Sequence, residues 1–156
     1  MRTLFTRALV VLAITTIGAF AADNSIGTWK FNAEKSKYTP APMPVKSLTI
    51  TREAADGGVK VTQTGERADG TAISAGYTAK YDGKEVKVTG VAPYDTIAIK
   101  QVNANTYTDE RKNTGTKYVA TGRTVISGGG KIMTTTAKGT AADGKPFTLT
   151  YVLDKQ

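Results

Sequence analysis

Apolar and polar residues alternate with a period of two along most of the chain. In the stretch AISAGYTAKY, for example, Ile73 and Tyr77 share one face while Ser74 and Thr78 share the other. This period is typical of a strand with one buried face, and a helix does not produce it. The same alternation occurs in SLTIT, VKVTQT, EVKVT, TIAIK and FTLTYVL. The pattern predicts ten strands, over residues 27–33, 46–53, 58–65, 71–81, 84–89, 95–101, 105–111, 116–126, 131–138 and 146–153.

Short turn sequences separate the predicted strands, such as Asp56-Gly57-Gly58 and Asp82-Gly83. Turns of this kind make consecutive strands antiparallel neighbours, and a long meander protects its edges by closing on itself. The predicted fold class is therefore all-β, an up-and-down antiparallel β-barrel of about 8-10 strands, with a two-sheet sandwich as the alternative. Only NAEKSKY is compatible with a helical turn, and the three prolines of residues 40–44 then favour an extended strap.

The first 21 residues have a different pattern. Arg2 and Arg7 supply positive charge, residues 8–20 are mostly apolar, and small residues lead to Ala21. This is typical of a signal peptide that is cleaved after Ala21. The apolar stretch is shorter than the ~20 residues of a membrane-spanning helix, so no membrane span is expected. The predicted organisation is a signal peptide over 1–21 and a single barrel domain over 22–156, located in the periplasm or secreted.

The residue inventory argues against catalysis. The chain has no His and no Cys, so the commonest general base, the thiol nucleophile and the soft metal ligands are missing. The acidic residues Asp56, Asp69, Asp82 and Asp143 lie in Asp-Gly turns, where backbone geometry accounts for them. We therefore expect no enzymatic activity, no cofactor and no metal site. Disulfides are also excluded, and the core alone has to stabilise the fold.

The basic charge does not point to nucleic acid. The chain has 21 Lys and Arg against 13 Asp and Glu, but the lysines alternate with Thr on faces opposite the aromatic residues. Phosphate contacts and base stacking would not share a surface. The lysines are expected to form a solvated outer face, with weak attraction to an anionic envelope surface as the functional alternative. An outer-membrane barrel is not expected, because such barrels present an apolar band to lipid.

The only Trp lies in the first predicted strand, two residues after Gly27. Barrel closure pairs the first and last strands, so GTWKF is expected beside TYVLDKQ. Trp29 then plugs one end of the barrel, and Gly27 allows the chain to pass closely beneath it.

This G-x-W arrangement resembles the calycins, the group of lipocalins and fatty-acid-binding proteins. The resemblance implies a cation stacked over the indole, and Lys155 is the candidate. The stretches GTWKFNAEKSKY, YTAKYDGKEVKVTG and DGKPFTLTYVLDKQ further resemble a lipocalin-like family of small exported bacterial proteins, most of them uncharacterised. That resemblance implies export and a barrel without a defined activity. The second and third lipocalin motifs are absent, and the first connection is too short for paired lid helices.

Alternation also predicts which polar side chains face the interior. If Tyr107 points inward, Asp109 and Arg111 do as well, and if Val119 and Val125 point inward, so does Arg123. A guanidinium inside a barrel needs an anion, either from a ligand or from an internal carboxylate. The candidate ligand-binding residues are Arg123, Arg111, Tyr77, Tyr107 and Tyr151.

Each candidate has a structural alternative. Arg123 lies in solvent if Tyr118, Ala120 and Ile126 face inward instead, and Arg111 forms an exposed pair if it meets Asp109 or Glu110 at the surface. Core packing alone explains the tyrosines equally well.

Two functions remain. The first is an exported protein that binds a small hydrophobic or amphipathic ligand, such as a fatty acid, inside the barrel. The second is a filled barrel that acts through its surface as an envelope-associated, inhibitory or interaction protein. For the second, GVAPYD (residues 90–95) and the proline strap are the loops to suspect.

Overall fold

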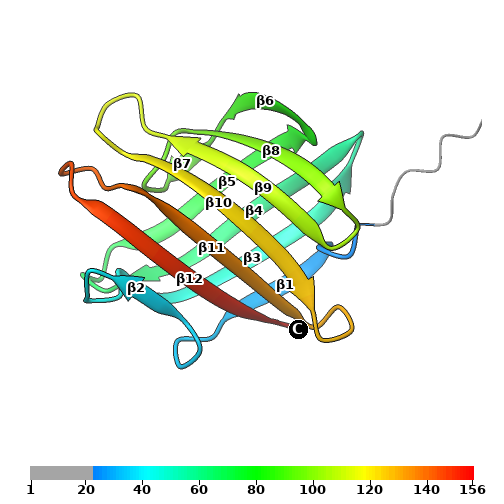
Figure 1. Ribbon diagram of the computed structural model, residues 1–156, viewed down its shortest axis with the longest axis horizontal. Coiled ribbons are helices and arrows are strands. Elements are labelled where there is room, and N and C mark those ends of the chain that lie inside the picture. Colours follow the sequence, from blue (N-terminus) through cyan, green and yellow to red (C-terminus); the bar gives the residue numbers. More distant parts are fainter. Residues whose placement is uncertain (1–22) are drawn as a thin grey trace, which may run out of the picture.

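The computed structural model describes residues 23–156. Every regular element in that range is a β-strand, and the strands form one antiparallel sheet that curls into a nearly closed barrel (Figure 1). The all-β antiparallel barrel predicted from the sequence is confirmed, and the two-sheet sandwich is not formed. The signal peptide predicted over residues 1–21 lies outside the described residues.

The described residues form twelve strands, against the ten predicted. They are β1 (Gly27–Phe31), β2 (Lys37–Thr39), β3 (Val45–Ala55), β4 (Gly58–Arg67), β5 (Ala72–Lys80), β6 (Asp82–Lys87), β7 (Thr89–Val91), β8 (Thr96–Asn103), β9 (Thr106–Lys112), β10 (Val119–Ser127), β11 (Ile132–Thr140) and β12 (Pro146–Lys155).

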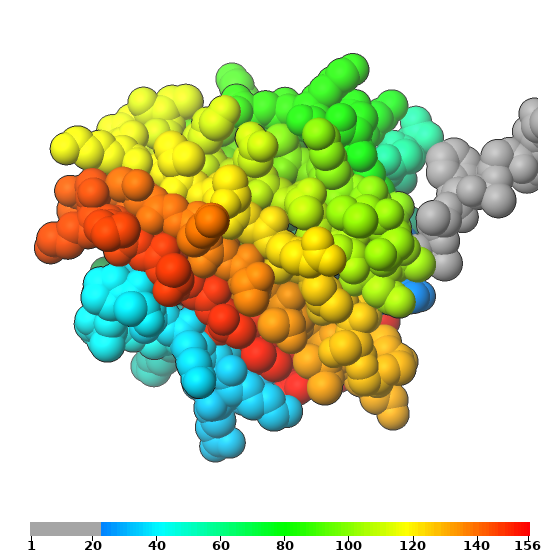
Figure 2. Space-filling view, viewed as in Figure 1, coloured from blue at the N-terminus to red at the C-terminus, as the bar shows by residue number. Residues whose placement is uncertain are grey.

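The additional strands arise in two short segments. The stretch expected as a helical turn ends in β2, which pairs with β12. Ser36 causes this, because its hydroxyl donates to the Asn32 carbonyl at 2.7 Å and accepts from the Val152 amide at 2.9 Å. The side chain thus closes a turn and ties it to β12. Figure 2 shows the segment (blue to cyan) packed along β12 (red). The strand predicted over 84–89 is divided into β6 and β7 by Val88.

The division of this strand into β6 and β7 connects the two edges of the sheet and so closes the barrel. The strand order is β6-β8-β9-β10-β11-β12-β1-β3-β4-β5-β7, and its end strands β6 and β7 are consecutive in the chain. β6 pairs with β8, whereas β7 pairs with β5. One bent segment therefore crosses from one edge of the sheet to the other, which covers edges that would otherwise expose backbone groups.

The first and last strands pair as expected, with Trp29 opposite Lys155 and Phe31 opposite Leu153. Trp29 is fully buried, and its Nε1 donates to the Ser25 carbonyl at 2.8 Å. The Lys155 ammonium lies 5.1 Å from the centroid of the indole. Gly27 makes room for this lysine, since a Cβ there would lie 2.6 Å from Lys155 Cε. Indole, lysine and glycine thus form one packed unit at this end of the barrel.

The connections at the opposite end surround an opening. We call these segments the mouth: residues 40–44, 68–71, 92–95, 113–118 and 141–145. The described residues contain no helix with the length and apolarity needed to cross a membrane.

Replacing Gly27 tests the packed unit at the Trp29 end. The φ angle of Gly27 is 135°, which L side chains rarely adopt, and an added methyl also meets Lys155. We expect Gly27→Ala to lower the free energy of unfolding by about 1–3 kcal/mol, measured by urea denaturation with Trp29 emission as the signal. The penalty should be smaller in a Lys155→Ala background, where the obstructing side chain is gone. Equal penalties in both backgrounds would contradict the contact with Lys155.

Candidate functional site

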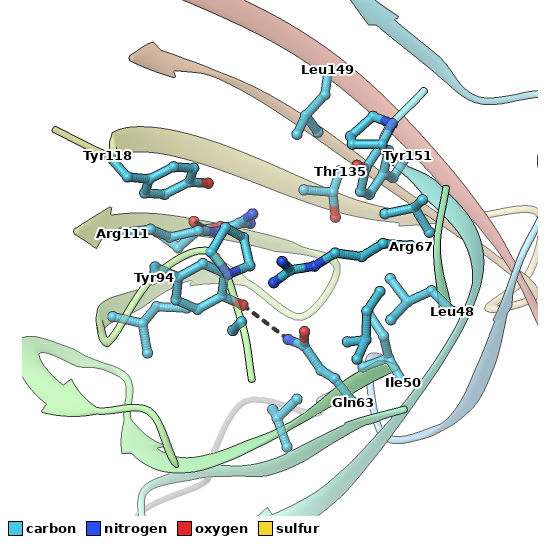
Figure 3. Close-up of a pocket in the computed structure, with 18 of the residues that line it drawn as sticks. Leu48, Ile50, Gln63, Arg67, Tyr94, Arg111, Tyr118, Thr135, Leu149 and Tyr151 are labelled. Atoms are coloured by element: carbon cyan, nitrogen blue, oxygen red, sulfur yellow. Dashed lines mark hydrogen bonds and ion pairs between the residues drawn. The ribbon is translucent and has the colours of Figure 1, made fainter. Parts of the chain in front are cut away.

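A cavity of about 630 Å³ occupies the barrel interior, within the ~300–1,000 Å³ typical of small-molecule sites. Inward side chains of the strands form its walls, and the mouth segments form its rim. Residues that alternation places on the inner face line it, including Val61 and Ile99. Figure 3 shows Leu48, Ile50 and Leu149 on the same wall. The barrel is therefore hollow and mainly apolar inside.

Four aromatic rings stack in series beside the mouth. Tyr38 stacks on Phe147 with centroids 5.7 Å apart, Phe147 on Tyr118 at 5.8 Å, and Tyr118 on Tyr94 at 6.2 Å. The interplanar angles are between 15° and 27°. These rings come from β2, β12 and the connections before β10 and β8, so the stack joins four separate segments. We call it the aromatic wall.

Arg111 is held inside the barrel by Asp109. Its Nε and Nη2 donate to the two oxygens of Asp109 at 2.6 and 3.0 Å, and the side chains are only 15% and 8% exposed. The guanidinium also lies 5.5 Å from the centroid of the Tyr94 ring. Burial alone lowers the pKa of Arg111, but Asp109 and the neighbouring tyrosines outweigh it and raise the pKa above the ordinary value. The predicted pair with Asp109 exists, but inside the barrel rather than at the surface.

A second polar cluster lies next to Trp29, and we call it the closed-end cluster: Asp23, Ser25, Arg52, Tyr81 and Tyr107. The Asp23 carboxylate accepts from the Ser25 amide at 2.9 Å, from the Tyr107 hydroxyl at 2.5 Å and from the Tyr81 hydroxyl. Arg52 Nε donates to Ser25 Oγ at 2.9 Å. Burial raises the pKa of Asp23, but the hydrogen bonds from Ser25, Tyr107 and Tyr81 outweigh burial and hold the pKa below 3.8.

Arg67 differs from the other arginines that line the cavity. It is half-buried at the end of β4, and Figure 3 shows its guanidinium projecting into the cavity. Within residues 23–156 no hydrogen bond or ion pair joins that guanidinium to another side chain. Close by, Gln63 Nε2 donates to the Tyr94 hydroxyl at 3.0 Å, the contact dashed in Figure 3.

The three candidate tyrosines all line the cavity. The Tyr107 hydroxyl donates to Asp23 and therefore belongs to the closed-end cluster. Burial, followed by this hydrogen bond, raises the pKa of Tyr107 to about 12. Burial also raises the pKa values of Tyr77 and Tyr151 well above the ordinary 10.0. Neither of these two hydroxyls has a hydrogen-bond partner among the described residues. Tyr77 and Tyr151 therefore offer donors to the cavity.

The assignment of Arg123 to the ligand site is wrong. Arg123 is exposed on the outer face of β10, and Val119 on the same face is 48% exposed. The alternating residues Ala120, Thr124 and Ile126 are the buried ones. The inward set thus starts from Tyr118, the alternative considered above, and Arg123 takes the opposite side.

Sequence reasoning missed Arg52, Gln63 and Arg67, although the signal was present. Arg52 follows Leu48 and Ile50 at a spacing of two, and Gln63 and Arg67 continue the series that starts at Val59 and Val61. Because these side chains are polar, a pattern of apolar residues alone does not include them, although they occupy the same inward-facing positions.

No three acidic side chains within residues 23–156 lie close enough to hold a metal ion.

No model of a known protein family matches the chain. No curated protein matches it at the sequence level. Among solved structures, zebrafish ileal bile acid-binding protein complexed with cholic acid aligns with a TM-score of 0.48 and 11% identity, over 86% of this chain and 100% of that one. A protein of unknown function from the DUF3598 family of Nostoc punctiforme aligns with a TM-score of 0.55 and 15% identity over 93% of this chain. This chain spans only 53% of that protein's length. At such identities the second comparison supports the fold alone, and membership of a lipocalin-like family stays a prediction.

Removing the carboxylate of the buried pair should be costly. Asp109→Asn leaves the Arg111 guanidinium without its counter-charge, and we expect the free energy of unfolding to fall by about 3–5 kcal/mol. Glu53→Gln is the matched control, because Glu53 pairs with Lys60 at 3.3 Å on the surface, where the loss should be about 0–1 kcal/mol. Urea denaturation of both variants makes the comparison, and similar losses would contradict an interior role for the Asp109 pair.

The closed-end cluster should weaken in acid. Because the pKa of Asp23 is lowered in the folded state, its contribution to stability is present above pH 3.8 and is lost as the pH falls through the folded-state pKa. We expect Asp23→Asn to be less stable than the unsubstituted protein by about 1–3 kcal/mol at pH 7, with the difference shrinking below pH 4. Urea denaturation across pH 3–7 measures this, and a difference independent of pH would show that the charge of Asp23 does not stabilise the fold.

Proposed function

We propose that this protein binds a small hydrophobic or amphipathic molecule inside its barrel. The supporting observation is the cavity of about 630 Å³, whose apolar walls carry a small number of polar groups. Sites for small molecules commonly combine an apolar lining with a few fixed polar contacts that orient the ligand. The strands hold both kinds of side chain in place, since each inward residue is fixed by the pairing of its strand.

The alternative of a filled barrel has less support. Such a barrel would have side chains across its interior, whereas this interior retains the cavity. The segment suspected as a surface loop in that alternative, GVAPYD, instead directs Tyr94 inward, where it is buried against Tyr118. We therefore assign this segment to the rim of the ligand site.

We further propose that the protein acts outside the cytoplasm and without catalysing a reaction. The support for export is the basic start, apolar stretch and small residues of positions 1–21. The support for a non-catalytic role is the lack of His and Cys in the chain together with the interior pairing of Asp109 and Arg111. Several exposed lysines pair with neighbouring carboxylates, which leaves only weak attraction to anionic surfaces as a further proposal.

Filling the cavity tests the proposed binding. Leu48 lies on the cavity wall and is 7% exposed, so Leu48→Trp places an indole in the ligand volume. The probe is N-phenyl-1-naphthylamine, a neutral dye whose emission rises in apolar surroundings. We expect saturable binding to the unsubstituted protein and at least about tenfold weaker binding to Leu48→Trp.

Val119→Trp is the matched control, because it adds the same side chain on the outer face and should leave dye binding unchanged. Circular dichroism checks that both variants keep the fold. Native mass spectrometry of the purified protein, with solvent extraction, looks for a bound molecule directly. A protein that binds no dye saturably and yields no extractable molecule would overturn the proposed function.

A further inference from the structure

The arginines that line the cavity are not equivalent in their partners. Arg111 is neutralised by both oxygens of Asp109. Arg52 donates to Ser25 and to the Tyr81 hydroxyl, in the cluster organised by the Asp23 carboxylate. Arg67 alone among these three has no such partner within residues 23–156, although it is half-buried and directed into the cavity (Figure 3).

No carboxylate among the described residues forms an ion pair with Arg67. Asp69 lies in the turn after Arg67, where hydrogen bonds from Thr71 and, as a smaller cause, the charge of Arg67 lower the pKa of Asp69. The Asp69 side chain is nevertheless exposed, and its oxygen accepts from the Thr71 amide at 2.9 Å instead of pairing with the guanidinium. Glu66 precedes Arg67 and therefore points to the other face of β4, where it pairs with Lys46 at 2.8 Å. Asp109 is occupied by Arg111. A half-buried guanidinium without a direct ion pair recovers little of the solvation that it loses, so an anion in the cavity would bind favourably beside it.

Two tyrosine hydroxyls can add hydrogen bonds to a ligand in the cavity. The hydroxyls of Tyr77 and Tyr151 have no hydrogen-bond partner among the described residues, and both side chains line the cavity. Each hydroxyl can donate one hydrogen bond to a ligand oxygen. The oxygen of a phenol can also accept a hydrogen bond, so the guanidinium, which is only a donor, is the group that favours an oxyanion or a carbonyl over an ammonium group.

The position of Arg67 fixes the direction of the ligand. Arg67 ends β4 at the mouth, and its backbone amide donates to the Thr71 carbonyl in the β4–β5 turn at 2.8 Å. Toward the Trp29 end the cavity lining includes Ile50, Ile99 and Leu153. Arg52 and Tyr107 also line the cavity there, but their polar groups have partners within the closed-end cluster. The charged group without a direct partner is therefore near solvent, and the available contacts deeper in the cavity are mainly apolar.

We propose that the ligand is an amphipathic oxyanion whose head group binds Arg67 at the mouth while its apolar part extends toward Trp29. This inference rests on the proposed ligand-binding function and adds the charge and the orientation of the ligand. Carboxylates and phosphate monoesters both match the planar fork of a guanidinium. The aromatic wall packs along the apolar part near the rim.

Matched amphiphiles test the head-group preference. Dodecanoate, dodecyl phosphate and dodecanol share one alkyl chain and differ in the head group. Each is titrated against bound N-phenyl-1-naphthylamine, and the loss of dye emission measures its affinity. At pH 7 the two anions should bind about tenfold or more tightly than dodecanol to the unsubstituted protein. Tighter binding of dodecanoate than of dodecyl phosphate identifies a carboxylate as the head group, and the reverse order identifies a phosphate. Equal affinity of all three amphiphiles would overturn the inference while leaving the proposed function intact.

Substitution of Arg67 tests whether this side chain causes the preference for the anionic amphiphiles over dodecanol. Arg67→Gln should remove most of the preference for the anions over dodecanol, and Arg67→Lys should restore part of it. Arg123→Gln removes one positive charge from the outer face instead and should keep the full preference. A preference that survives in Arg67→Gln, or that is lost equally in Arg123→Gln, would contradict a direct contact with Arg67. If no amphiphile displaces the dye because the dye itself does not bind, the proposed function and this inference fail together.

Discussion

The two-residue alternation of side chains along paired strands is the constraint on which this structure depends. In a barrel, the interior is accessible only to every second residue of each strand, so the register of a strand decides all its contacts together. Pairing of β1 with both β12 and β3 sets this register where the chain closes, with Trp29 opposite Lys155 on one side and Ile50 on the other. Once these pairs form, Arg52 is placed inside by the same alternation that buries Leu48.

The constraint also explains why this interior contains charge. A strand that must turn Tyr107 inward turns Asp109 and Arg111 inward as well, since the sheet offers no other direction. The cost of desolvating Asp109 and Arg111 is offset by two short hydrogen bonds between them and by the Tyr94 ring. Gly122 on the neighbouring strand contributes space, because a Cβ there would lie 2.6 Å from an Asp109 oxygen. Residues on neighbouring segments thus provide the space and the contacts that the Asp109–Arg111 pair needs inside an apolar barrel.

The sequence was sufficient for the fold class and for the pairing of the first and last strands, because both follow from periodicity and closure. The sequence predicted an inward-facing Arg111 only on a condition, because the face of β9 that points into the barrel had to be assumed from Tyr107. For Arg123 the parity of β10 was ambiguous, because Val119 and Ala120 are both apolar and nothing local separates them. Packing of Tyr118 against Phe147 and Tyr94 resolves the ambiguity, and those contacts join segments far apart in the chain. Division of the strand at Val88 likewise depends on two separate partners, β5 and β8.

The two ends of the barrel solve different physical problems. At the Trp29 end, polar groups are arranged so that donors and acceptors match: Asp23 accepts from tyrosine hydroxyls, and Arg52 donates to Ser25. Matched groups stabilise a closed end, and they leave little for a ligand to bind. At the mouth the balance is different, because the Arg67 guanidinium has donors without a direct acceptor among the described residues. Solvent near the rim makes an unpaired guanidinium tolerable in the empty barrel, whereas the same group beside Trp29 would carry a much larger desolvation cost. An unmatched charge is therefore compatible with stability only where Arg67 stands, and that is also where an entering ligand meets it first.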